Sequence, residues 1–237
     1  MFSVGTQWNP LQAKLRELLN QNGSFDEAME LLKSMHGLLH SREVYKSSEP
    51  TLMDEVWEDL SDIAFMTMPA AADVTVAWNI WHMTRIEDIT CNLLMADGDQ
   101  VLDEAWLEKL HTRVRDTGNA MTDAEILSFS GEVNKAALRE YRDAVGRRTG
   151  EVICGLVPED LKRKLAKRQT DRILAEGGIL THPDSEWLLD FWGKKNVAGI
   201  LLMPITRHQM GHLNDCLKLK DKCKKISRAN AKGEGLR

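Results

Sequence analysis

Several features that would narrow the range of possible functions are scarce in this sequence. Only four cysteines occur in 237 residues, and none belongs to a Cys-x-x-Cys motif. The absence of that motif leaves reduced cytosolic thiols as the simplest account. No apolar run approaches the roughly 20 residues of a membrane-spanning helix, and the first residues lack the basic and apolar regions of a secretory signal. We therefore expect a cytoplasmic protein that makes no membrane contact.

An excess of positive charge is also missing. The formal net charge is −5, and the isoelectric point is near 5.8, so the chain lacks the general signature of a polyanion-binding protein. One basic cluster, residues 159–168, contains leucines at helical spacing, which favours an ordinary helix with a solvated face. Nucleic acid is therefore not the expected partner.

Strand-like alternation of polar and apolar residues is absent over any useful length, whereas helical periodicity dominates the chain. This pattern predicts an all-α fold, a four-helix bundle with short extra helices in the connections. The long helices are expected near residues 24–46, 73–95, 122–148 and 196–222. Residues 1–225 form a single domain in this interpretation, and 226–237 form a flexible basic tail.

Two local signals refine the ends of these helices. Asp73 is the predicted cap of the second long helix, because a short polar side chain there can accept hydrogen bonds from the first turn. Pro204 lies inside the fourth long helix and removes one backbone donor. We therefore expect a kink just before the histidines that follow it.

Histidines at metal-ligand spacing are what the sequence does contain. His208 and His212 lie four residues apart in the fourth predicted helix. A helical wheel places both imidazoles on one face, about one turn apart, with Leu201, Ile205 and Leu219. The pair therefore faces the core, where an unpaired ring nitrogen costs roughly 1–3 kcal/mol. A metal ion is one way to meet that demand.

A third inward-facing histidine, His82, lies on the second predicted helix. It shares a stripe with Trp78 and Ile86, and Glu87 points away from that stripe. If the two helices are neighbours, His82, His208 and His212 could together hold a metal ion. Three imidazoles would leave at least one coordination position open, as in catalytic rather than structural zinc sites.

The two segments that carry these histidines also resemble a known family. The runs Trp-His-x-x-Arg-Ile-Glu-Asp from Trp81 and Arg-His-x-x-x-His-Leu-Asn-Asp from Arg207 are similar to the second and fourth helices of the DinB-like superfamily, also called DinB/YfiT-like. The resemblance covers most of the chain and implies a four-helix protein that holds a metal through His82, His208 and His212. Related members include enzymes that use mycothiol or bacillithiol, so it implies metal-assisted chemistry on a small molecule.

A metal at this site predicts an enzyme, either a hydrolase or a thiol-dependent S-transferase. The metal would activate water or a low-molecular-weight thiol against a small-molecule electrophile. Zinc or nickel is the expected divalent ion, and iron or copper also accepts imidazole ligands. Asp215 is a candidate general base or a partner for a ligand histidine. Arg85 could meet an anionic substrate group, although an ion pair with a neighbouring carboxylate is at least as good an explanation.

His36 and His40 form a second pair at the same spacing, on the first predicted helix. They are candidates to line the pocket, with Trp78, or even to provide a second metal position, although such histidines more often form hydrogen bonds inside a bundle. A non-catalytic alternative therefore stays open, in which a dimeric bundle binds a metal or ligand, for instance in a stress response. A homodimer is expected under either hypothesis.

Overall fold

The computed structural model describes residues 3–71 and 73–231, the last five of them by their backbone alone. Within these ranges the regular structure is helical, apart from one isolated bridge between Lys164 and Asn196. The predicted all-α class is therefore confirmed. The α-helices are α1 (Asn9–Asn20), α2 (Phe25–Leu39), α3 (Arg42–Tyr45), α4 (Leu52–Trp57), α5 (Asp62–Met66), α6 (Val76–Asp88), α7 (Glu104–Leu110), α8 (Asp123–Glu132), α9 (Lys135–Gly155), α10 (Lys167–Ala175), α11 (Pro183–Gly193), α12 (Val197–Leu202) and α13 (His208–Ala231). The other helical segments are π-helical η1 (Val4–Trp8), η2 (Ile89–Met95) and η4 (Met203–Arg207), and 3₁₀-helical η3 (Pro158–Lys162).

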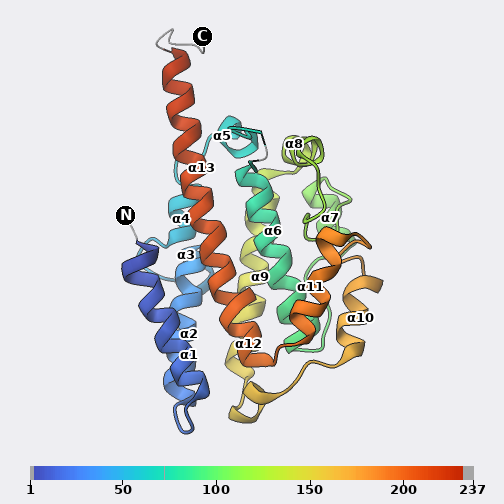
Figure 1. Ribbon diagram of the computed structural model, residues 1–237. Coiled ribbons are helices and arrows are strands. Elements are labelled where there is room, and N and C mark those ends of the chain that lie inside the picture. The colour runs from blue at the N-terminus through green and yellow to red at the C-terminus, as the bar shows by residue number, and fades with distance from the viewer. Residues whose placement is uncertain (1–2, 72, 232–237) are drawn as a thin grey trace.

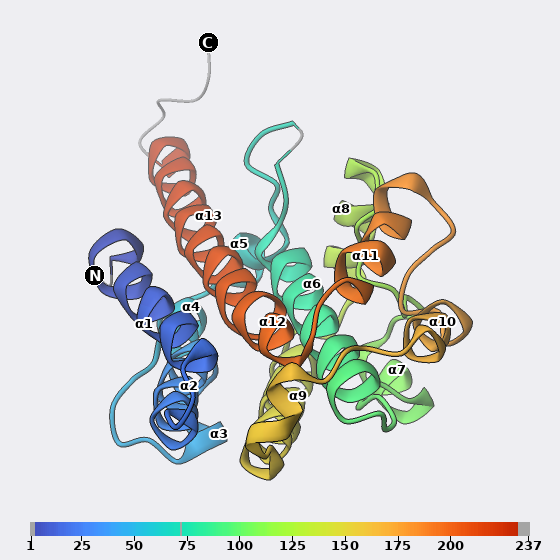
Figure 2. The ribbon, with the colours of Figure 1, turned by 60° about the horizontal axis from the view of Figure 1, so that its bottom comes forward.

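Helix α6 lies at the centre of the molecule, with α13 and α9 packed along it (Figure 1). The pair α1 and α2 lies on one side of this centre, and α7, α8, α10 and α11 lie on the other (Figure 2). Helix α13 extends past its neighbours at one end (Figure 1). Two segments far apart in the sequence, α6 and α13, are therefore neighbours in space.

The central helix is enclosed on nearly all sides, because every residue of α6 except Trp78 is buried. An enclosed helix is normally apolar all round, but α6 carries charged side chains. Arg85 pairs with Asp88 at 2.8 Å. Glu87 pairs with Arg142 of α9, also at 2.8 Å. Buried charges persist only when they are paired, so these two ion pairs explain how a charged helix can occupy the centre.

Two of the predicted long helices are divided in the structure. The first ends at Leu39, because His40 adopts an extended backbone and α3 follows as a separate helix. The third is broken between α8 and α9, where the side chain of Asn134 accepts a hydrogen bond from Ala137 N and begins a new helix. The predicted cap of α6 is also wrong. Thr75, not Asp73, is the N-cap, and its hydroxyl oxygen accepts from Trp78 N at 2.9 Å.

The expected irregularity at Pro204 takes the form of the π-helical turn η4 between α12 and α13. Side chains donate hydrogen bonds to carbonyl groups near this turn. The Thr206 hydroxyl donates to Leu201 O at 2.8 Å, and Gln12 Nε2 donates to Leu202 O at 2.8 Å. Proline leaves a carbonyl of the preceding turn without its donor, so a wider turn supported by side chains is the local solution. Helix α13 then starts at His208.

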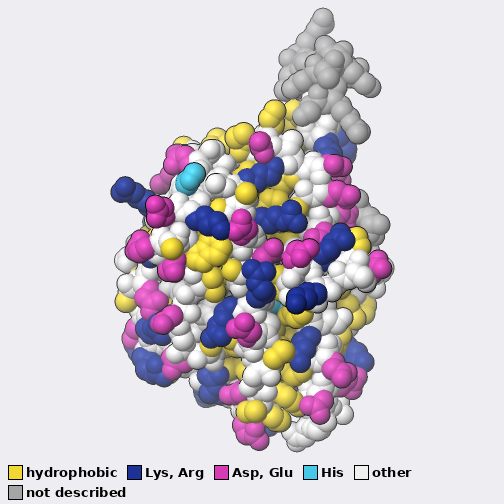
Figure 3. All heavy atoms as spheres, turned by 180° about the vertical axis from the view of Figure 1, so that it is seen from behind, with side chains coloured by type: hydrophobic (Ala, Val, Ile, Leu, Met, Phe, Trp, Pro, Cys, Tyr) yellow, Lys and Arg dark blue, Asp and Glu magenta, His cyan; other side chains and the backbone are white. Residues whose placement is uncertain are grey.

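The C-terminal end of α13 extends into the segment that was predicted to be a flexible tail. Helix α13 continues to Ala231, past residue 226, where the flexible tail was predicted to start; residues 232–237 of that predicted tail lie outside the described residues. Among the described helices, none has the length and apolar character needed to cross a membrane. On the face opposite to Figure 1, basic and acidic side chains are interspersed, with no single sign covering the face (Figure 3).

Candidate metal centre

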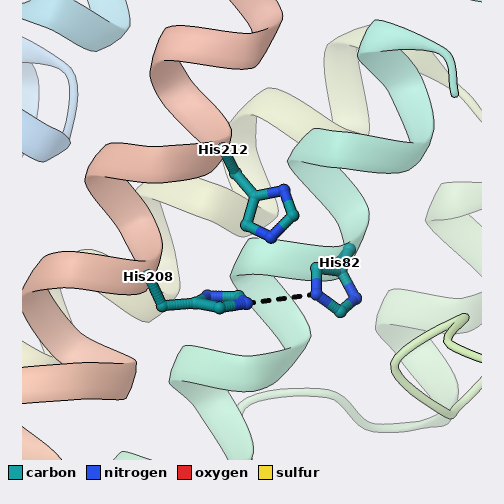
Figure 4. Close-up of side chains that lie close together, drawn as sticks. All are labelled: His82, His208 and His212. Atoms are coloured by element: carbon teal, nitrogen blue, oxygen red, sulfur yellow. Dashed lines mark hydrogen bonds between the residues drawn. The ribbon is translucent and has the colours of Figure 1, made fainter. Parts of the chain in front are cut away.

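The three predicted ligand histidines meet between α6 and α13 (Figure 4). His82 comes from the middle of α6, and His208 and His212 come from the first two turns of α13. Each ring offers one nitrogen to a group whose atoms all lie within 4.8 Å of one another. His82 Nε2 and His208 Nε2 lie 3.2 Å apart. This buried group could bind a metal ion.

Hydrogen bonds determine which nitrogen of two rings carries the proton. His82 Nδ1 lies 2.7 Å from Thr117 O, and His212 Nδ1 lies 2.7 Å from Asn79 Oδ1. Both oxygens are acceptors, and Asn79 uses its own NH₂ to donate to the Thr75 carbonyl, so both rings must be protonated on Nδ1. Their Nε2 atoms therefore carry free lone pairs, which is the tautomer that a metal ligand requires.

His208 is held differently from the other two rings. Its Nδ1 atom is buried and has no hydrogen-bond partner, and its Nε2 atom faces the lone pair of His82 Nε2. In the absence of a metal, an Nε2 proton on His208 can be donated to His82. Transfer of that proton to Nδ1 would make His208 the third ring with a free Nε2 lone pair.

Burial keeps all three imidazoles uncharged. It lowers the pKa of His82 to about 3, with a further contribution from the nearby His212. It lowers the pKa of His212 to about 4 and holds the pKa of His208 well below its usual range. A neutral imidazole is the form that binds metals, so protons do not compete with a metal for these nitrogens at neutral pH.

A loop that the sequence analysis missed supports α6 on the side of His82. Four consecutive carbonyls, those of residues 115–118, each accept a hydrogen bond from a side chain of α6. In chain order of the carbonyls, the donors are Arg85 Nε at 2.8 Å, Trp81 Nε1 at 3.0 Å, His82 Nδ1 at 2.7 Å and Trp78 Nε1 at 3.2 Å. The loop therefore orients His82 together with its neighbours on the same helix.

Two residues beside His82 make this arrangement tight. The Trp78 indole stacks on the His82 ring, with centroids 4.6 Å apart and an interplanar angle of 6°. Gly118 has a φ of +76°, and an added Cβ would lie 2.8 Å from Trp78 Nε1. Only glycine fits there, because both the backbone conformation and the close approach exclude a side chain. Trp78, a predicted pocket residue, thus forms a wall of the site and is only half-buried.

The two side chains predicted to take part in catalysis are engaged elsewhere. Asp215 has a side chain that is 52% exposed and pairs with Lys218 at 3.0 Å. Asn79, and not Asp215, is the residue that binds the outer nitrogen of His212. Arg85 is fully buried and pairs with Asp88. The ion-pair alternative for Arg85 is therefore the arrangement in the structure.

The contact between Asn79 and His212 predicts a specific effect on metal affinity. Replacing Asn79 by alanine should weaken metal binding about 10- to 100-fold, the usual cost of losing a partner of a ligand histidine. Competition with a chromophoric chelator would measure this loss. Asp215→Ala is the matched control and should bind metal as the wild type does, because its carboxylate faces solvent. Equal losses in both variants would contradict the assignment of Asn79.

A second histidine cluster surrounds Glu87 of α6, away from His82. His36 Nε2 and His40 Nε2 lie 2.8 Å and 3.0 Å from Glu87 Oε1. Tyr45 Oη lies 2.6 Å from His36 Nδ1, and Arg142 binds the other carboxylate oxygen of Glu87. The side chains of both histidines, Glu87 and Arg142 are completely buried. The pocket predicted for His36 and His40 is thus a closed polar cluster, and Glu87, which does point away from His82, is its centre.

The cluster depends on a glycine in α9. A Cβ atom at Gly146 would overlap the His40 ring, so Gly146→Ala is expected to destabilise the protein by about 1–3 kcal/mol, the typical cost of overpacking a core. Chemical denaturation would measure the free energy of unfolding. Gly155→Ala in the same helix is the control, since a Cβ there meets no atom within 4 Å. If Gly146→Ala is as stable as the control, the His40 ring does not pack against Gly146.

Comparison with known proteins agrees with the resemblance seen in the two histidine runs. A sequence model described as the DinB superfamily matches residues 47–216, which include His82, His208 and His212 but neither His36 nor His40. No curated protein matches the chain significantly. The family match covers most of the chain, and the fold is all-α, as the resemblance implied. The chain belongs to the DinB superfamily.

Proposed function

We propose that the protein is a metal-dependent enzyme that uses His82, His208 and His212 to hold a divalent ion. The observation that carries this proposal is the pair of outer hydrogen bonds to Thr117 O and Asn79 Oδ1, because they turn two Nε2 lone pairs toward a common centre. Hydrogen bonds of this kind are typical of metal-ligating histidines.

The residues present fit a metal of this class. Zinc–nitrogen bonds are about 2.0–2.1 Å long, so two ligands of a tetrahedral zinc lie roughly 3.3 Å apart. The 3.2 Å between His82 Nε2 and His208 Nε2 is close to that separation. Neutral imidazoles suit zinc and nickel, which we propose first, and also iron and copper.

The reaction proposed is hydrolysis or thiol transfer on a small electrophile, with a low-molecular-weight thiol as the co-substrate in the second case. When bound, the metal supplies a Lewis acid that lowers the pKa of a water or thiol and polarises the electrophile. The protein holds His82 and His212 rigid through Thr117 and Asn79. The half-buried face of Trp78 offers an apolar wall for a small substrate. A cytoplasmic homodimer is part of the same proposal.

One observation favours a second candidate, a metal-binding bundle without turnover. Asp215 and Arg85, the side chains expected to act in catalysis, are paired with Lys218 and Asp88 instead. In the enzyme, proton transfer would then rely on the activated water or thiol and on the substrate itself.

Thiol binding to the cobalt-substituted protein would separate the two candidates. We expect a small thiol to produce a thiolate-to-cobalt absorption band in the wild type and none in His208→Ala. Metal-loaded wild type should then hydrolyse an activated ester or conjugate the thiol to an aromatic electrophile, and chelation should abolish that activity. Bound cobalt that shows neither a thiol band nor turnover would favour the non-catalytic bundle.

A further inference from the structure

We propose that His36, His40 and Glu87 form a second site for a divalent metal ion, distinct from the three-histidine centre. One carboxylate oxygen and one nitrogen of each histidine lie within 4.8 Å of one another. Glu87 follows His82 by five residues, so it lies roughly 140° around α6 from that ligand. The two groups therefore use different faces of the same central helix.

The geometry of the cluster is close to that of a bound metal. The Nε2 atoms of His36 and His40 lie 2.8 Å and 3.0 Å from Glu87 Oε1. Ligands of one tetrahedral zinc are roughly 3.3 Å apart, so an expansion of a few tenths of an ångström would admit the ion. Two histidines and one glutamate are also an established ligand set for zinc.

The surroundings hold these ligands from outside. Tyr45 Oη contacts His36 Nδ1 at 2.6 Å, and Arg142 Nη1 donates to Glu87 Oε2 at 2.8 Å. These contacts leave Glu87 Oε1 facing the Nε2 atoms of both histidines. Without metal, both histidines donate Nε2–H to Glu87. With metal, the Nε2 proton of each ring moves to its own Nδ1. The hydroxyl oxygen of Tyr45 can accept the hydrogen bond from His36 Nδ1, whereas His40 Nδ1 has no partner among the described residues.

The charges in the cluster suit a cation. Burial alone would raise the pKa of Glu87, but the N–H groups of His40 and His36 and the Arg142 guanidinium, which donate to the carboxylate, hold it well below the usual range, so Glu87 is ionised. Burial lowers the pKa of His40 to about 3, so that ring is neutral. The Arg142 guanidinium pairs with Glu87 at 2.8 Å and also donates to the Leu39 carbonyl at 3.2 Å. Arg142 thus binds Oε2 of Glu87 and leaves Oε1, with its negative charge, to the two histidines.

Family membership does not account for this site. The matched span starts at residue 47, whereas His36 lies on α2, His40 directly follows that helix, and Tyr45 lies on α3. The site therefore joins the part of the chain before the matched span to the central helix within it.

Metal stoichiometry tests the proposal independently of the first centre. Wild-type protein and the double variant His208→Ala/His212→Ala would be incubated with excess zinc, desalted and subjected to elemental analysis. We expect about two equivalents in the wild type and about one in the double variant. Addition of Glu87→Gln, which keeps the shape of the side chain, should remove the remaining equivalent.

The outcomes are decisive even if the triple variant folds poorly. A double variant that is folded by circular dichroism but retains no zinc would overturn the second site. A double variant that retains one equivalent, with the same amount in the wild type, would support the second site and instead refute the three-histidine centre. The two proposals therefore fail in distinguishable ways.

Discussion

Replacing His208 by alanine is expected to weaken metal binding at the three-histidine centre by roughly 100- to 1000-fold. A complete structural zinc site contributes about 10–16 kcal/mol over four ligands, or roughly 2.5–4 kcal/mol for each. A change of about 1.4 kcal/mol is a factor of ten in affinity. Competition titration against a chromophoric chelator would measure the change, and His82→Ala should behave in the same way.

The control for this prediction is a histidine outside the centre. His111 is exposed and ends α7 with a left-handed backbone, at a φ of 55°. Asparagine tolerates that conformation, so His111→Asn removes an imidazole with little effect on the fold. We expect it to bind metal as tightly as the wild type. If His208→Ala and His111→Asn have the same affinity, His208 is not a ligand.

Replacing Glu87 by alanine should lower the free energy of unfolding by about 3–5 kcal/mol, measured by denaturant titration in the presence of a chelator. The reason is that its partner Arg142 would remain charged and completely buried with no carboxylate beside it. His36 and His40 would also lose their common acceptor. An effect of this size is a large share of the stability of a typical domain.

A surface ion pair provides the comparison. Lys167 and Asp171 lie 2.6 Å apart on α10, with side chains 85% and 58% exposed. Asp171→Ala should cost no more than about 0.5 kcal/mol, because water screens the pair. A loss for Glu87→Ala that is no larger than this would show that the buried cluster does not stabilise the fold.

The helical period alone identified much of the fold. It predicts the all-α class and the direction of His82, His208 and His212, because all three lie on apolar stripes of long helices. It also predicts that Glu87 points away from His82. What it cannot show is that α2 and α9 cover that opposite side, since a wheel describes one helix and not its neighbours. The sequence therefore shows only that Glu87 points away from His82, and the structure adds that it is buried.

The other differences between the predicted and the observed helices have causes in the local sequence. The break before α9 could have been recognised, since Asn134 is a good capping residue two positions after the end of α8. The start of α6 was less clear, because Asp73 and Thr75 are both capping residues and only the structure shows which one accepts from the helix. The run Asp116-Thr117-Gly118-Asn119 indicates a loop, but no sequence pattern shows that its carbonyls would face α6.

The loop at residues 115–118 has a consequence for how this protein can diverge. It supports Trp78, Trp81, His82 and Arg85 through main-chain carbonyls, which every amino acid possesses. The four acceptors themselves therefore place no demand on side-chain type. Among the loop residues, Asp116 accepts a hydrogen bond from Gly118 N at 2.7 Å and Thr117 is buried, so Arg115 is the position that can vary most freely while His82 keeps its orientation. In related sequences, selection on this support should be recorded in the four donors of the helix and in Asp116, Thr117 and Gly118, and least at Arg115.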